Sequence, residues 1–188
     1  IDQLAARGIR HVFEVPGESF LAALDGLHDT QTVDVIVCRH EGGAALMAEA
    51  MGKMTGRPGI AFATRGPGVV NAVAGVYVAQ QDATPMILFV GLPTTRLDDN
   101  APFQEIDIGQ LFRGIAKWTA VIRQPRRIAE YVERAFTVAM SGRPGPVVIG
   151  LPEDVLSATA EGGVAAPTAL AVAAPSPRDI GALRDRLS

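Results

Sequence analysis

One glutamate in this sequence has the position that a catalytic carboxylate would need. Glu41 lies three residues after the end of a short β-branched run at residues 33–38 and begins a segment rich in Ala and Gly, residues 41–56. The first run is typical of a strand buried in a parallel sheet, and the second is typical of a helix. Ligands of open parallel sheets bind at the carboxyl ends of the strands, beside helix N-termini. The position of Glu41 therefore suits a catalytic carboxylate and makes it the first candidate for chemistry.

A structural explanation of Glu41 competes with this one. Acidic residues are common in the first turn of a helix because they complement the helix dipole, and the segment alone favours that explanation. A second junction of similar construction changes the balance. The apolar run at residues 60–64 is followed by a glycine-rich turn at residues 65–68 and then by an Ala- and Val-rich helix. Two such junctions together favour a shared site.

Several other kinds of site find little support. The turn at residues 65–68 lacks the third glycine of a dinucleotide-binding fingerprint and the lysine of a P-loop. His11, His28 and His40 are isolated from one another, so no metal site is predicted in this chain. Cys38 lies within an apolar run and is interpreted as a buried structural thiol, with a reactive thiol as the lesser alternative.

Composition narrows the class of protein further. The 188 residues are 48% hydrophobic and 20% charged, which is typical of a soluble globular domain. A formal net charge of -3 argues against nucleic-acid binding. The sequence has no apolar run long enough to cross a bilayer and no signal-peptide pattern, so we predict a cytoplasmic protein that does not bind membranes.

Strand and helix patterns alternate along the chain, which predicts an α/β fold. We expect three layers: a doubly wound, mostly parallel sheet of about six strands with helices on both faces. Residues 93–114 are expected to form a long polar loop with an amphipathic piece at residues 106–112, acting as a lid or an interface. The expected strands are residues 11–15, 33–38, 60–64, 86–90, 118–122 and 146–151, and the expected helices are residues 1–7, 19–27, 41–56, 69–81 and 124–140, with a further helical pattern at residues 178–187.

Five motifs in the same order resemble a known family. The chain resembles the N-terminal pyrimidine-binding domain of thiamine-diphosphate enzymes, and the closest resemblance is to the acetolactate synthase-like branch. The resemblance covers nearly everything up to residue 155. The motifs are Val-Phe-Glu-Val-Pro-Gly at residues 12–17, Arg-His-Glu-Gly-Gly-Ala at 39–44, Thr-Arg-Gly-Pro-Gly-Val-Val-Asn at 64–71, Ala-Pro-Phe-Gln-Glu-Ile-Asp at 101–107 and the segment at 144–155.

The resemblance implies a role for Glu41. In this family a carboxyl group shares a proton with the cofactor's pyrimidine ring and drives it to the imino tautomer, which then deprotonates the thiazolium carbon. By resemblance Glu41 is that catalytic group. The residues implied to contact the cofactor are Pro16, Gly17, Glu41, Gly66, Pro67, Gly68 and Asn71.

Asn71 has an alternative to cofactor contact, because it could equally hold its loop to the following helix. The resemblance also suggests three substrate contacts, each with an alternative. Phe103 is either a substrate contact or a core anchor, and Gln104 is either a substrate contact or a solvated loop amide. Arg65 either holds a substrate carboxylate bidentately or is a solvated turn residue.

The sequence departs from the family pattern at four positions, so the reaction stays open. Gly42 stands where many acetolactate synthases have glutamine, and Arg65 stands where they usually have serine. Glu14 and Glu18 replace glycine and small residues beside the Pro-Gly turn. The entrance of the site is therefore expected to be specialised.

The family binds the diphosphate through a divalent cation in a separate C-terminal domain, and no Gly-Asp-Gly motif for it occurs here. We therefore expect a fragment: residues 1–157 as an N-terminally truncated pyrimidine-binding domain, 158–177 as an Ala/Pro/Gly-rich linker, and 178–188 as the start of a truncated middle domain. Such a chain would be inactive alone and would bind thiamine diphosphate and Mg²⁺ weakly.

The resemblance implies a homo-oligomer, at least a dimer, in which the diphosphate-binding domain of another subunit completes the site. The substrate would be a small 2-oxo acid, and FAD binding is left undecided. Two alternatives stay open. The chain could be the pyrimidine-domain subunit of a split 2-oxo acid decarboxylase, or a nonenzymatic assembly domain that keeps the fold.

Overall fold

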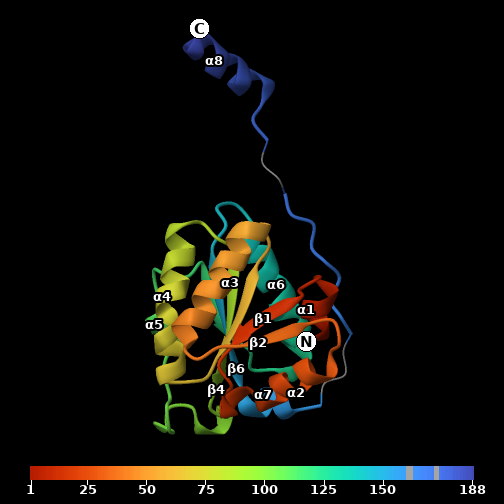
Figure 1. Cartoon of the computed structure of the whole chain (residues 1–188), viewed down its shortest axis with the longest axis vertical. Helices are drawn as coiled ribbons and strands as arrows, with labels where there is room; N and C mark the ends of the chain where they lie inside the picture. The colour runs from red at the N-terminus through yellow and green to blue at the C-terminus, as the bar shows by residue number, and fades with distance from the viewer. Residues whose placement is uncertain (160–162, 172–173) are drawn as a thin grey trace.

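The computed structural model describes residues 1–159, 163–171 and 174–188. Within these residues, six strands form one parallel sheet in the order β2-β1-β3-β4-β6-β5, flanked by helices (Figure 1). The strands are β1 (His11–Glu14), β2 (Asp34–Val37), β3 (Gly59–Ala63), β4 (Met86–Leu92), β5 (Trp118–Val121) and β6 (Pro146–Pro152). The α-helices are α1 (Asp2–Ala6), α2 (Leu21–Asp29), α3 (Glu41–Thr55), α4 (Pro67–Gln81), α5 (Ile108–Leu111), α6 (Ile128–Met140), α7 (Glu153–Ser157) and α8 (Pro177–Leu187), and the 3-10 helices are η1 (Glu18–Phe20), η2 (Thr95–Leu97) and η3 (Pro125–Arg127).

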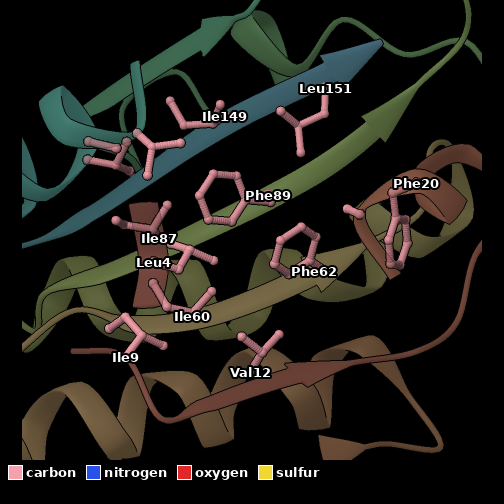
Figure 2. Close-up of a cluster of buried hydrophobic side chains, with 14 of the residues drawn as sticks. Leu4, Ile9, Val12, Phe20, Ile60, Phe62, Ile87, Phe89, Ile149 and Leu151 are labelled. Carbon is pink, nitrogen blue, oxygen red and sulfur yellow. The ribbon is translucent and has the colours of Figure 1, made fainter. Parts of the chain in front are cut away.

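The sheet separates two hydrophobic cores, which confirms the predicted three-layer architecture. On one face, large side chains of the central strands pack against α1, α2 and α6 (Figure 2). Phe62 is central there, with its ring centroid 5.6 Å from that of Phe20 and 4.8 Å from that of Phe89. On the other face, alanines and valines of α3 and α4 cover the sheet. Alternate residues of each strand face opposite cores because strand side chains alternate in direction.

Small residues bring α3 and α4 into close contact. Gly75 of α4 lies so near α3 that an added Cβ would sit 2.5 Å from Ala45 Cβ and 2.8 Å from Leu46 N. The C-terminal end of α3 is capped by Gly56 with φ 65°, as the glycine at the end of the predicted helix indicated. The two helices thus form one rigid layer, and each begins at the carboxyl end of a strand.

One prediction about the sheet is wrong. The run at residues 33–38 was expected to be a buried strand, but β2 is the edge strand of the sheet. Ile36 is 37% exposed and Val37 is 64% exposed. The β-branched composition correctly indicated a strand, but its place in the sheet depends on which strands pair with it.

The region after β6 contains one element that the sequence patterns did not predict and one that they did. The short helix α7 directly follows β6, and α8 corresponds to the helical pattern after residue 177. In Figure 1, α8 lies apart from the α/β body. The predicted linker at 158–177 includes residues 160–162 and 172–173, which lie outside the described residues, and the three domain boundaries stay predictions. Along the described chain, no helix combines the length and apolarity of a membrane span.

Candidate active site

The two candidate junctions meet where the winding of the sheet changes direction. From β1 the chain passes to α2 on one face, whereas β3 is followed by α4 on the other face. β1 and β3 are neighbours in the sheet, so their carboxyl ends form a topological switch point, the usual ligand site of such folds. The turn after β1 touches the end of β3: a Cβ on Gly17 would lie 2.5 Å from Thr64 Cβ.

Glu41 is the first residue of α3 and is half-buried. The preceding residue caps the helix, because His40 Nδ1 accepts a hydrogen bond of 3.0 Å from the Gly42 N–H. Asn71 of α4 donates from Nδ2 to Glu41 Oε2 over 3.0 Å. The carboxylate is therefore oriented by a neighbouring helix and keeps its second oxygen available. Asn71 is both a structural tie between the helices and a neighbour of the candidate acid.

The glycine-rich turn borders the same carboxylate. Gly66 has φ 61° and ψ -120°, a conformation that favours glycine, and Pro67 begins α4. A Cβ on Gly68 would lie 3.2 Å from Glu41 Oε1 and 2.6 Å from Thr64 Cγ2. The missing side chain at Gly68 therefore lets the turn pack directly against Thr64 and the Glu41 carboxylate, which a larger side chain would prevent.

The loop after β4 reaches the glycine-rich turn through Gln104. A Cβ on Gly66 would lie 2.7 Å from Gln104 Cβ, and Gln104 itself has φ 62°. One interpretation of Phe103 was a core anchor, but its side chain is 78% exposed and packs in no core of the described residues. The structure therefore places Gln104 beside the turn and leaves the ring of Phe103 open to contact from outside.

One interpretation of Arg65 was a solvated turn residue, but its side chain does not project freely into solvent. Its guanidinium forms an ion pair with Glu153, the first residue of α7, and only 13% of its side chain is exposed. The Arg65 Nε atom is buried without a partner among the described residues. The carboxylate that Arg65 binds in this structure belongs to the protein, so a substrate carboxylate would have to share or displace that contact.

Some site-forming residues were not singled out from sequence. The hydroxyl groups of Ser19 and Thr64 form a hydrogen bond of 2.8 Å across the switch point. Gly91 of β4 permits this contact, since a Cβ there would lie 2.2 Å from Ser19 Oγ. A glycine inside an otherwise apolar strand was the available signal, because it often marks a close approach by another segment. Pro16, which precedes Gly17 in the turn after β1, is exposed.

The buried thiol of Cys38 and a separate cavity are two further features of the chain. Cys38 is buried, and burial raises the pKa of its thiol, which disfavours a reactive thiolate. A cavity of about 580 Å³ lies between the loop after β4 and β5, lined by residues that include Asp98, Glu105 and Arg123 but not Glu41. The described residues contain no group of three His, Cys, Asp or Glu side chains arranged to hold a metal ion.

Glu14, at the carboxyl end of β1, provides the first testable prediction. The side chain is 1% exposed, its Oε2 atom has no partner among the described residues, and burial raises its pKa above the ordinary value of 4.5. A carboxyl group with a raised pKa binds its proton more tightly in the folded state than in the unfolded state. Its contribution to stability is therefore complete below about pH 4.5 and declines as the pH rises through the folded pKa.

We expect Glu14→Gln, which stays neutral, to gain thermal stability relative to the wild-type chain between pH 4.5 and pH 7. Calorimetry at both pH values measures this change, and Glu18→Gln, at an exposed position nearby, is the control. Parallel pH dependences for wild type and Glu14→Gln would contradict the assignment of Glu14 as a buried acid.

Comparison with known proteins identifies the family of the chain. Residues 1–111 match the family model described as thiamine pyrophosphate enzyme, N-terminal TPP binding domain. The chain is 38% identical over 155 residues to the mitochondrial acetolactate synthase catalytic subunit of Aspergillus candidus, covering 82% of this chain and 22% of that protein. It is 36% identical to the acetolactate synthase isozyme 3 large subunit of Escherichia coli K12 (84% and 27% covered), and 40% identical to the probable large subunit of Methanocaldococcus jannaschii (82% and 26% covered). The chain spans about a quarter of the length of these curated relatives.

Proposed function

Because the chain belongs to the thiamine pyrophosphate enzyme family, as its N-terminal TPP-binding domain, we propose that it supplies the pyrimidine-binding half of an enzyme that acts on a 2-oxo acid as acetolactate synthases do. One observation carries the proposal. The Glu41 carboxylate stands at the carboxyl end of the sheet, oriented by Asn71 and bordered by the side-chain-free edge of Gly68. These residues fit the flat, nitrogen-containing end of the cofactor.

The proposed role of Glu41 is to hold and exchange one proton. Asn71 holds Oε2 through its amide N–H, so the remaining oxygen is the one that would meet a ring nitrogen. When bound, thiamine diphosphate supplies a nucleophilic thiazolium carbon. The tasks left to this chain are to bind the pyrimidine edge beside the turn at Gly68 and to shuttle the proton at Glu41. Pro16, Gly17, Gly66 and Pro67 would form the surrounding backbone walls.

A second subunit is proposed to complete the site. The outer surface of α3 and α4, next to Glu41, exposes large apolar side chains: Leu46 is 42% exposed, Met47 40%, Val70 48% and Tyr77 49%. An exposed apolar patch of this kind is typical of a surface that another protein covers. We propose that a second copy of the complete protein covers it, and that its diphosphate-binding domain provides the Mg²⁺ site.

Substrate contacts are proposed at the rim. Gln104 lies against Gly66, and the exposed ring of Phe103 could cover a bound substrate. Arg65 is proposed to hold a substrate carboxylate in competition with Glu153, which already neutralises it. Because the chain includes only a quarter of its relatives' length, the 2-oxo acid and the use of FAD are open, and the cytoplasmic location stays a prediction.

The complete protein containing this chain tests the proposed function. With thiamine diphosphate, Mg²⁺ and pyruvate, we expect release of CO₂ and formation of acetolactate. Removal of the metal with EDTA should abolish turnover, and added Mg²⁺ should restore it. The isolated 188-residue chain should bind the cofactor weakly by calorimetry. Absence of cofactor-dependent consumption across a panel of 2-oxo acids would contradict the proposal.

A further inference from the structure

Two buried polar side chains and a half-buried arginine meet between α1 and α6, on the face of the sheet opposite to α3 and α4. Gln3 is 5% exposed and Glu133 is 6% exposed. Arg7 pairs with Glu133 over 2.5 Å and lies over the ring of Phe136, with its guanidinium carbon 5.2 Å from the ring centroid. Polar groups at this depth are expected to have hydrogen-bond partners. Here several of those hydrogen-bond partners are main-chain groups of a segment far downstream in the sequence.

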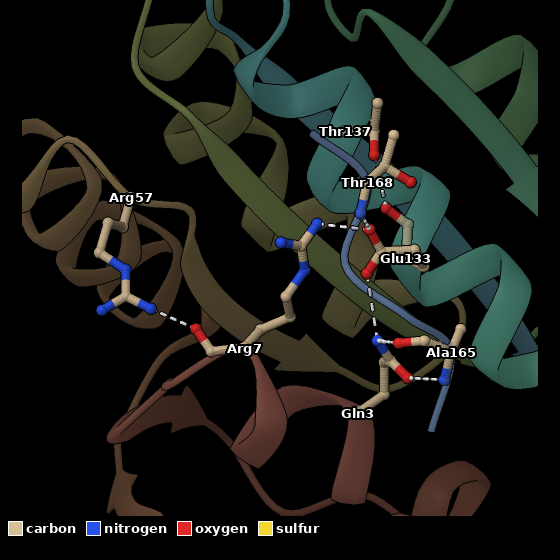
Figure 3. A network of polar contacts seen from close by, with 7 residues as sticks. All are labelled: Gln3, Arg7, Arg57, Glu133, Thr137, Ala165 and Thr168. Atoms are coloured by element: carbon tan, nitrogen blue, oxygen red, sulfur yellow. Dashed lines mark hydrogen bonds and ion pairs between the residues drawn. The ribbon is translucent and has the colours of Figure 1, made fainter. Parts of the chain in front are cut away.

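The downstream partner is the main chain of residues 165–168 (Figure 3). Gln3 Nε2 donates to the Ala165 carbonyl over 3.1 Å, and the Ala165 N–H donates to Gln3 Oε1 over 2.7 Å. A single glutamine thus pairs with both main-chain groups of one residue, as a neighbouring strand would. The Thr168 N–H donates to Glu133 Oε1 over 2.7 Å, and Gln3 Nε2 also reaches Glu133 Oε2 at 3.1 Å.

We propose that Gln3, Arg7 and Glu133, here named the α1–α6 clasp, form a binding surface for the main chain of the segment at residues 165–168 and anchor the linker to the α/β body. The segment suits this role. Pro167 has no N–H to leave unpaired, and it biases Ala166 towards an extended conformation. The clasp binds the amides on either side of that dipeptide. Arg7 balances the charge of Glu133 and orients its carboxylate.

Anchoring changes how far the downstream chain can reach. The 20 residues from 158 to 177 would span up to about 70 Å if free and fully extended, at roughly 3.3–3.6 Å per residue. Past the clasp, only the eight residues from 169 to 176 precede α8, which limits the span to about 30 Å. The clasp also holds Ala165 and Thr168 on the side of the sheet opposite to α3 and α4. This inference does not depend on the proposed catalytic function.

Hydrogen exchange in the 188-residue chain, followed by NMR, tests the clasp. After correction for intrinsic rates, the amides of Ala165 and Thr168 should exchange about ten- to a hundredfold more slowly than that of Ala166, which makes no hydrogen bond to a described residue. In Gln3→Met, which keeps the side-chain length, the protection of Ala165 should be lost. The amide of Phe89 in β4 should stay protected, which shows that the fold is intact.

The control for this substitution is Gln31→Met, at an exposed turn, which should leave the protection of Ala165 unchanged. A second variant, Thr168→Pro, removes one amide donor from the linker without touching the α/β body, and it should lower the protection of Ala165. Equal exchange of Ala165 and Ala166 in the wild-type chain would overturn the proposal. So would unchanged protection of Ala165 in Thr168→Pro, even if Gln3→Met fails to fold.

Discussion

Glu41→Gln in the complete protein is expected to lower kcat by about 10²- to 10⁴-fold, the range in which a positioned proton-transfer group contributes. Glutamine keeps the size of the side chain, and its carbonyl can still accept the hydrogen bond from Asn71 Nδ2. It cannot exchange a proton with a ring nitrogen. Thermal stability should fall by no more than about 2 kcal/mol, the upper value for a charge at a partly buried helix N-terminus. Steady-state kinetics and calorimetry on the same samples separate these effects.

Two further variants locate the effect at this carboxylate. Glu130→Gln removes a glutamate from the first turn of another helix, α6, where it pairs with Arg127 at the surface, and it should leave kcat unchanged. Asn71→Ala leaves the Glu41 carboxylate in place but removes its donor, so a smaller loss of about tenfold is expected. If Glu41→Gln turns over as fast as wild type, Glu41 does not have the proposed role.

Gly75→Ala is expected to destabilise the chain by about 1–3 kcal/mol, the usual cost of overpacking a filled core. The added Cβ would lie 2.5 Å from Ala45 Cβ and 2.6 Å from the Ala45 carbonyl carbon, so α3 and α4 would have to move apart. For a domain of this size we expect a fall in Tm of roughly 2–4 °C per kcal/mol. Because Glu41 and Asn71 stand on these two helices, the complete protein should also lose activity.

The matched control is the same substitution in α3, at a position away from its contact with α4. A Cβ on Gly43 of α3 would meet nothing within 4 Å, so Gly43→Ala should keep or raise stability, by up to about 1 kcal/mol, through its higher helix propensity. Urea unfolding of both variants measures the difference. Similar free energies of unfolding for the two variants would show that the close approach of α3 and α4 does not limit packing at Gly75.

The sequence by itself determined the order of the elements and the identity of the candidate acid. Strand and helix patterns depend on residues within a few positions of one another, so the alternation that gives three layers can be read locally. The position of Glu41 at a strand-to-helix junction is local as well, whereas its proposed role came from the resemblance to a family. The turn at Gly66 and Gly68 was also recognisable, since a left-handed conformation and a close approach both favour glycine.

The tertiary structure alone decided which residues meet. The edge position of β2, the ion pair of Arg65 with Glu153 and the clasp on Ala165 join segments that are far apart in sequence. Composition shows that a side chain can form an ion pair or a hydrogen bond, but it does not show which partner lies within reach. The partners are decided when the strands pair in their particular order. Only then do the desolvated polar groups lie next to the donors and acceptors that compensate their burial.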